Sequence, residues 1–175
     1  FHIGGREGTT HVAAAINVAA GDHLLDVGCG IGGAARFLAS STGASVTGID
    51  LTPEFVDAAI QLSDLVGVGA LVDFKVGSAL DLPFLDNSFD AVTMLHVGMN
   101  IENKVQMMSE LARVCRSGGT VVVYDVTTTG DGDLPYPMPW STTAEFSFPE
   151  TATTYEAAGV DVGLEHVSSS NHYDL

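Results

Sequence analysis

Short apolar runs alternate with amphipathic segments along most of the chain, and several of the runs end at a glycine or an acidic residue. Brief apolar runs are typical of buried strands, whereas apolar positions at helical spacing indicate helices. The runs predict strands at residues 23–27, 44–49, 71–76, 90–95 and 120–126. The segments between them predict helices at residues 8–20, with Thr9 or Thr10 as N-cap, and at 33–42, 52–66 and 102–115. This alternation predicts an α/β fold with a doubly wound, mostly parallel sheet.

The pattern changes after residue 126. Residues 127–148 are first polar and then rich in proline and aromatic side chains, which is too rigid and too apolar for an ordinary linker. One interpretation is a lid over a substrate pocket, and the other is a surface loop folded against its own domain. Residues 149–158 then predict a short helix, and residues 160–167 predict a sixth strand.

A glycine-rich turn follows the first predicted strand. The strand ends at Asp26, and Gly28 and Gly30 follow before the next helical segment. Strand, glycine turn and helix together form a nucleotide pocket in α/β sheets, because glycine lets the backbone approach a ligand closely. The second strand ends in Asp50, whose carboxylate is placed to accept both hydroxyls of an adenosine ribose or to cap the helix that follows. These features predict an adenosine-containing cofactor.

Two cofactors fit the glycine turn. Residues 28–33 satisfy the G-x-G-x-x-G pattern, so an NAD-dependent oxidoreductase is one interpretation, although the pattern alone is weak. Asp26 favours another cofactor, because an acid here would repel an anionic pyrophosphate. It suits a ligand with an ammonium and a sulfonium, as in S-adenosylmethionine, although it could also be a buried carboxylate that only holds the loop.

Further segments occur in a recognisable order: Asp50-Leu51, residues 77–80, residues 87–92 and residues 111–124. With the glycine turn, they resemble the class I SAM-dependent methyltransferases, most closely small-molecule enzymes of the quinone, tocopherol and sarcosine type. The resemblance implies S-adenosylmethionine as cofactor and S-adenosylhomocysteine as product. It implies cofactor contacts from Arg6, Asp26, Gly28, Cys29, Gly30, Asp50, Leu51, Ser78, Ala79, Leu80 and Leu95. Arg6 would pair with the cofactor carboxylate, unless it belongs to a frayed terminus.

The candidate catalytic residue is His96, which closes the fourth strand at the carboxyl edge of the sheet. It is either a general base toward the acceptor or a structural histidine. Methyl transfer from a sulfonium needs no metal, and we expect none. Tyr136, Met138 and Trp140 are candidate acceptor contacts, because aromatic faces suit an apolar or cationic molecule.

Composition narrows the function further. The chain has 175 residues, so we expect one domain, 1–175, and its net charge is −16 with six Lys and Arg residues. Such a balance disfavours nucleic acids and anionic membranes as partners. Cys29 and Cys115 lack disulfide spacing, which indicates a reducing cytoplasm.

The resemblance also implies a further helix and an antiparallel seventh strand that nothing after Val167 supplies, so we expect a truncated C-terminus. The sequence predicts methyl transfer from S-adenosylmethionine to a small organic acceptor. An NAD-dependent oxidoreductase and a catalytically silent SAM-binding domain are the alternatives, and the oligomeric state is open.

Overall fold

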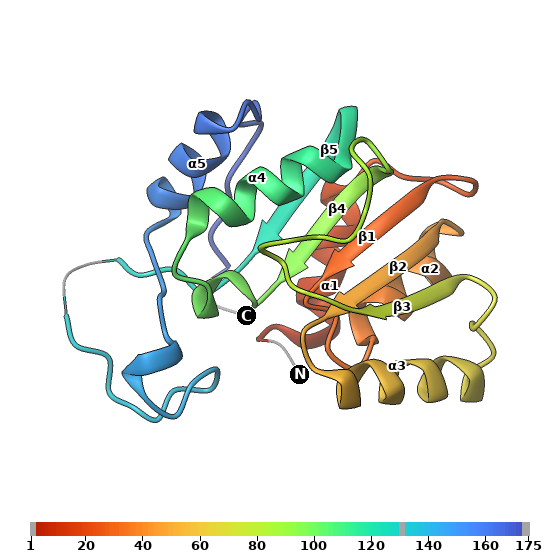
Figure 1. The fold of residues 1–175 in the computed structure, drawn as a ribbon, viewed down its shortest axis with the longest axis horizontal. Coiled ribbons are helices and arrows are strands. Elements are labelled where there is room, and N and C mark those ends of the chain that lie inside the picture. Colours follow the sequence, from red (N-terminus) through yellow and green to blue (C-terminus); the bar gives the residue numbers. More distant parts are fainter. Residues whose placement is uncertain (1–2, 130–131, 173–175) are drawn as a thin grey trace.

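The protein is described by a computed structural model that covers residues 3–129 and 132–172. Its centre is a sheet of five parallel strands in the order β3-β2-β1-β4-β5 (Figure 1). The strands are β1 (His23–Val27), β2 (Ser45–Asp50), β3 (Val72–Val76), β4 (Phe89–Leu95) and β5 (Cys115–Tyr124). The predicted doubly wound parallel sheet is confirmed. Its order reverses between β1 and β4, and such a switch point opens a crevice at the carboxyl ends of the strands.

Helices cover both faces of the sheet (Figure 1). They are α1 (Gly5–Ala15), α2 (Gly33–Thr42), α3 (Pro53–Leu65), α4 (Lys104–Val114) and α5 (Ala152–Asp161), with two 3₁₀ turns, η1 (Gly98–Asn100) and η2 (Ala144–Phe146). Neighbouring strand residues divide between the two cores: Leu24 packs with α2 and α3, whereas Leu25 packs with α4 and α5. Buried parallel strands need this cover, because both of their faces are apolar.

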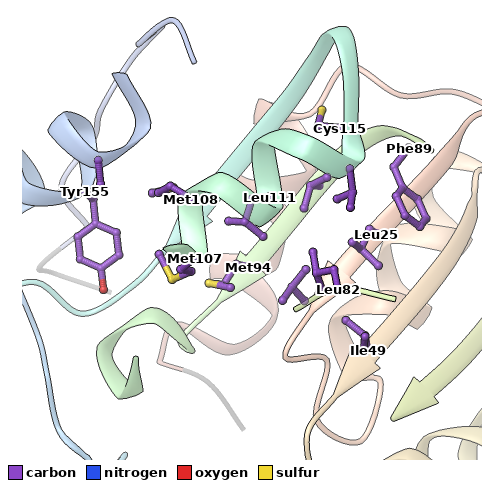
Figure 2. Close-up of a cluster of buried hydrophobic side chains, with 14 residues drawn as sticks. Leu25, Ile49, Leu82, Phe89, Met94, Met107, Met108, Leu111, Cys115 and Tyr155 are labelled. Carbon is purple, nitrogen blue, oxygen red and sulfur yellow. The ribbon is translucent and has the colours of Figure 1, made fainter. Parts of the chain in front are cut away.

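The core beneath α4 is a cluster of buried hydrophobic side chains (Figure 2). Met107 and Leu111 of α4 belong to one buried cluster with Leu25 of β1 and Met94 of β4, and all four side chains are inaccessible to solvent. A completely buried leucine or methionine stabilises a fold by about 1.5–3 kcal/mol relative to an exposed one. This packing fixes the carboxyl ends of β1 and β4, where the candidate site lies.

The first helix starts earlier than predicted. It spans Gly5–Ala15 with Gly4 as N-cap, so the assignment of Thr9 or Thr10 as cap is wrong. The hydroxyl of Thr9 donates to the Gly5 carbonyl, and that of Thr10 donates to the Arg6 carbonyl. Threonine makes such bonds to the preceding turn inside a helix, and these residues therefore lie within α1.

The predicted sixth strand is also wrong. Helix α5 extends to Asp161, Gly163 then adopts a left-handed backbone with φ of 90°, and the Leu164 N–H donates to the Gly159 carbonyl. A glycine in this conformation is a common helix end. Within the described part of the chain, no strand follows β5. In addition, β5 begins at Cys115 rather than at residue 120 and ends at Tyr124.

No helix in the described ranges has both the length and the apolar character that a membrane crossing requires.

Candidate active site

The loop between β1 and α2 is held against the end of β2. The N–H groups of Gly28 and Cys29 both donate to the Ile49 carbonyl, at 2.7 and 3.0 Å. Gly28 has a left-handed backbone with φ of 72°, and a Cβ atom there would lie 2.2 Å from Cγ2 of Val97. No residue with a side chain fits this position without moving the residues that follow β4. The loop and the end of β4 are therefore in direct contact.

Asp50 ties this loop to the helix that follows β2. One carboxylate oxygen accepts from the Gly30 N–H at 2.8 Å, and the other accepts from the Thr52 N–H at 2.9 Å. Both interpretations of Asp50, ribose binding and capping of the helix that follows, are compatible with this geometry. A carboxylate has about four acceptor sites, and only two are used. The remaining sites are available to ribose hydroxyls.

Asp26 is a buried carboxylate with one unused oxygen. Asp26 is 1% exposed, and its Oδ1 accepts a hydrogen bond from the Thr93 hydroxyl at 3.0 Å. Oδ2 is buried and has no hydrogen-bond partner within the described residues. Burial, and to a smaller extent the charge of Asp50, raises the pKa of Asp26 to about 7. A cation bound beside Oδ2 would satisfy this oxygen and favour the ionised form.

These groups border one large cavity. Its volume is about 1080 Å³, which accommodates a nucleoside with a second small molecule. Every predicted cofactor contact lines it, together with the candidate catalytic residue: Arg6, Asp26, Gly28, Cys29, Gly30, Asp50, Leu51, Ser78, Ala79, Leu80, Leu95 and His96. Sequence reasoning missed other lining residues, including Phe37, Phe55, Asn100 and Glu102. Phe55 could have been found from its place in the first turns after Asp50.

Cys29 and Arg6 border the cavity in different ways. The Cys29 thiol lies close to Gly48, where a Cβ atom would be 2.9 Å from its sulfur, and burial raises its pKa far above the usual range. Arg6 lies in the first turn of α1, with its guanidinium 5.5 Å from the centre of the Phe37 ring. Cys29 is thus a packing residue that borders the cavity, whereas Arg6 presents a positive charge to it.

His96 occupies a strained position just after β4. Its φ is 54°, which is uncommon for a residue with a side chain and costs on the order of 1–3 kcal/mol. The backbone N–H donates to the Tyr124 carbonyl, Nε2 lies 3.2 Å from the Ile3 carbonyl oxygen, and the ring packs edge-on against Tyr124. The imidazole thus connects β4, β5 and the segment before α1 at the cavity wall.

Asn100 joins this cavity to the segment after β5. Its side-chain amide donates to the carbonyl oxygens of Trp140 and Phe146, at 3.2 and 2.8 Å. The Phe148 N–H donates to the Met99 carbonyl at 2.7 Å. Residues 127–148, as far as they are described, are therefore fastened to the η1 turn at two points.

A second, smaller cavity of about 420 Å³ lies in that segment. Met138 and Trp140 line it together with Asp133 and Leu134, and the Trp140 indole donates to the Ser147 hydroxyl at 2.9 Å. None of the three predicted acceptor contacts is among the described residues that line the large cavity, and Tyr136 lines neither cavity. The structure thus brings the predicted cofactor contacts together but leaves the predicted acceptor contacts apart from them.

The family described as a methyltransferase domain matches residues 25–123 of the chain. The chain belongs to this family. This membership confirms the resemblance to class I SAM-dependent small-molecule methyltransferases and supports S-adenosylmethionine, rather than NAD, as the cofactor.

Curated relatives agree with this placement, and a solved structure agrees with the fold. The chain is 41% identical over 100 residues to a probable chloroplastic tocopherol O-methyltransferase of Oryza sativa subsp. japonica, covering 57% of this chain and 28% of that protein. It is 39% identical over 115 residues to the 2-methyl-6-phytyl-1,4-hydroquinone methyltransferase of Synechocystis sp. (66% and 35% coverage). The [4+2]-cyclase SpnF has a similar structure (TM-score 0.77, 27% identity, 89% and 56% coverage). The chain spans about a third of the length of these two curated relatives.

A buried polar cluster supports the η1 turn of this methyltransferase domain. Asp125, directly after β5, accepts from the Tyr155 hydroxyl at 2.8 Å, and burial raises the pKa of Asp125 to about 6. The Lys104 ammonium donates to the carbonyls of Gly98 and Phe148 at 2.9 and 2.7 Å, and also to that of Ile101.

Gly98 is pressed against this cluster. A Cβ atom on Gly98 would lie 2.5 Å from Oδ2 of Asp125 and 2.8 Å from the Tyr155 oxygen. Sequence reasoning did not find the cluster, because its members are single residues that are far apart in the chain. The cluster fixes the turn that carries Asn100.

Proposed function

We propose that this protein transfers a methyl group from S-adenosylmethionine to a small organic acceptor. The observation that carries the proposal is the buried, unpartnered Oδ2 of Asp26 in the same cavity as the glycine loop and Asp50. A cationic ligand satisfies this oxygen, and an adenosine ribose fits the free acceptor sites of Asp50. The residues present therefore fit the cofactor of the family.

Each wall of the cavity has a distinct task in this proposal. Asp50 holds the ribose, and the apolar side chains of Leu51 and Phe55 border the adenine. Asp26 and Arg6 hold the ammonium and carboxylate of the methionine end. The bound cofactor supplies an electrophilic methyl group on a positively charged sulfur, so the protein needs mainly to align the acceptor. Alignment of this kind contributes roughly 7–11 kcal/mol when the geometry is near that of attack.

His96 is the candidate general base for an acceptor that must lose a proton. It lies at the cavity wall at the carboxyl end of β4, where its ring is held by Tyr124 and the Ile3 carbonyl. Base catalysis typically contributes 10²–10⁴-fold to a rate, and only a protonated acceptor benefits from it. The names of the tocopherol and hydroquinone relatives support a small organic acceptor.

Titration calorimetry with S-adenosylmethionine, S-adenosylhomocysteine and NADH tests the cofactor. We expect about micromolar affinity for the two adenosyl ligands and no heat with NADH, since Asp26 opposes a pyrophosphate. Binding of NADH alone would contradict the proposal and favour hydride transfer. Formation of S-adenosylhomocysteine in the presence of an acceptor then distinguishes an enzyme from a domain that only binds the cofactor.

We also propose that residues 127–148 form a lid over the acceptor. The bonds from Asn100 to this segment support the idea, because they join it to the cofactor cavity. Trp140→Ala is expected to leave the affinity for S-adenosylmethionine unchanged and to raise the KM of the acceptor. An unchanged KM and turnover would contradict a role for Trp140 in acceptor binding. The cytoplasmic location, the absence of nucleic-acid partners and the single domain remain predictions from the sequence.

A further inference from the structure

The structure describes all six lysine and arginine residues of the chain, so the partners of each positively charged side chain can be given. Three of the arginines are engaged by other groups and are not among the described residues that line the large cavity. Arg36 donates to the Ile31 carbonyl at 2.8 Å; Arg113 pairs with Glu110 at 2.7 Å and with Asp86 at 2.9 Å; and Arg116 pairs with Asp90 at 2.5 Å.

The two lysines are also engaged elsewhere. The Lys104 ammonium is bonded to three backbone carbonyls and is 5% exposed, and that of Lys75 lies 5.3 Å from the centre of the Phe84 ring. Neither lysine lines the large cavity or the smaller one. Arg6 is therefore the one lysine or arginine among the described lining residues.

Arg6 already has a partner in the proposed function, since the carboxylate of the methionine end requires it. The other charged residues of the cavity walls are acids: Asp26, Asp50 and Glu102 in the large cavity, and Asp133 in the smaller one. Phosphate and carboxylate groups are usually bound by arginine, lysine or helix N-termini. The N-terminus of α2, whose Gly33 and Ala34 also line the cavity, already faces the Asp26 carboxylate, so an acceptor with a negative charge would meet acids of like charge.

We propose that this methyltransferase takes acceptors without a negative charge, uncharged or amine-bearing, and rejects phosphorylated or carboxylated ones. This inference rests on the proposed function, because it reserves Arg6 for the cofactor. The smaller cavity supports it, since an aromatic residue, Trp140, and an acid, Asp133, both line it. An aromatic face next to a carboxylate attracts an ammonium group and gives nothing to a phosphate. His96, the histidine of the large cavity, adds no charge when it is neutral.

Three phenols that differ only in the charge of a side chain test the inference. They are tyramine, 4-ethylphenol and 3-(4-hydroxyphenyl)propionate, assayed at pH 8 with saturating S-adenosylmethionine by release of S-adenosylhomocysteine. At this pH the amine is protonated, the carboxylate is ionised and the phenol is neutral. We expect kcat/KM for the first two to exceed that for the propionate by about tenfold or more, because no lysine or arginine among the described lining residues is left to bind the carboxylate of the propionate. Equal or better use of the propionate would overturn the inference.

The fluorescence of Trp140, the single tryptophan of the chain, gives a readout that needs no turnover. Quenching by iodide and by caesium is measured at constant ionic strength and normalised to quenching by acrylamide. An acidic surrounding is expected to weaken quenching by iodide about threefold relative to free N-acetyltryptophanamide, because it repels the anion. Because the net charge of the chain, −16, repels iodide by itself, the same measurement is made on Asp133→Asn, which should bring iodide quenching closer to that of the free compound. This comparison decides the case if none of the phenols is methylated, and iodide quenching that is the same in the variant and the unmodified chain overturns the inference.

A charge variant locates the effect. Glu102→Gln removes an acid from the large cavity. It is expected to reduce the ratio of kcat/KM for 4-ethylphenol to kcat/KM for the propionate about threefold. Glu165→Gln removes the same charge from an exposed position outside both cavities and is expected to leave the preference unchanged. Equal effects of the two variants would overturn the inference. Loss of S-adenosylmethionine binding in the unmodified chain would contradict the proposed function itself, whereas normal binding with a preference for anions contradicts only the inference.

Discussion

The proposed cofactor half of the site, in the large cavity, and its proposed acceptor half, around η1 and the smaller cavity, are built in different ways. Residues 23–52 supply the first half as one unbroken strand-loop-helix-strand unit, in which backbone groups bind one another and Asp50. The second half is assembled from η1, the end of β5 and residues 138–149, which are joined mainly by side-chain bonds from Asn100 and Lys104. A contiguous unit keeps its geometry when distant residues change. Single residues of the second half can be substituted, and the acceptor can thereby change, without disturbing that unit.

The comparison predicts which substitutions affect both halves and which affect only one. A change at the contact between the two halves has the largest expected effect, and a change in the acceptor half alone has the smallest.

Gly28→Ala is expected to damage both halves. The left-handed backbone costs about 1–2 kcal/mol for alanine, and the new Cβ would also displace Val97 from 2.2 Å. We expect the affinity for S-adenosylmethionine in calorimetry to fall about a hundredfold or more, since each 1.4 kcal/mol is tenfold.

Gly67→Ala is the matched control for that change. Gly67 has a similar φ of 75°, but a Cβ atom there would meet nothing within 4 Å. Its cost is expected to appear in thermal unfolding only, with normal cofactor affinity. Equal losses of affinity in both variants would show that backbone strain, and not the contact with Val97, is responsible.

Asp26→Asn is expected to affect the cofactor half alone. Loss of a charged partner lowers the affinity for S-adenosylmethionine by about thirtyfold, in the usual range for hydrogen bonds to charged groups. In the unmodified chain, the affinity is expected to rise about tenfold from pH 6 to pH 8, because the cofactor binds the ionised form of a carboxyl whose pKa is about 7. The variant should lose this pH dependence. Asp73→Asn, an exposed acid on β3, is the control and should retain it.

The same carboxyl predicts a pH-dependent stability without cofactor. Because the pKa of Asp26 is raised on folding, the native state keeps this proton to a higher pH than the unfolded chain does. Its stabilising contribution is complete below about pH 4 and is lost as the pH rises to about 7. The free energy of unfolding of Asp26→Asn minus that of the unmodified chain should therefore increase over this interval in denaturant titrations. A constant difference would show that Asp26 is ionised throughout.

Asn100→Ala is expected to affect the acceptor half alone. It removes two hydrogen bonds to the segment that carries Trp140, each worth about 0.5–1.5 kcal/mol. The KM of an acceptor should rise about fivefold while the affinity for S-adenosylmethionine stays within a factor of about two. Asn17→Ala, an exposed asparagine before β1, should change neither quantity. A large loss of cofactor affinity in Asn100→Ala would show that the two halves are not independent.

The sequence predicted the cofactor half because its information is local. Gly28, Gly30 and Asp50 stand at fixed distances from the ends of strands, and parallel strands bring those ends to one edge. The acceptor half carries no such pattern, since Asn100 and Tyr155 act through contacts with residues distant in the chain. The two interpretations of residues 127–148, a lid or a surface loop, come from composition alone, and composition does not say which side chains face the cavity.

The errors also have local causes. The residues expected to form a sixth strand alternate apolar and polar positions, but the hydrogen bonds that end α5 involve Gly163 and Leu164 instead. Gly163 was a readable stop signal for a helix. At the N-terminus, threonine at positions 9 and 10 favours a cap, but the same hydroxyl can donate to the carbonyl of the preceding turn inside a helix, and that of Thr9 donates to Gly5.

Gly98 has a consequence for how this domain can change over evolution. A methyl group at this position would meet both the Asp125 carboxylate and the Tyr155 hydroxyl, so mutation of the glycine requires that both side chains shift or are replaced. Conversely, once Gly98 has been lost, restoring the pair between Asp125 and Tyr155 recreates the clash. The three positions are thus expected to be inherited as a unit, and lineages that differ at one of them should differ at the others as well.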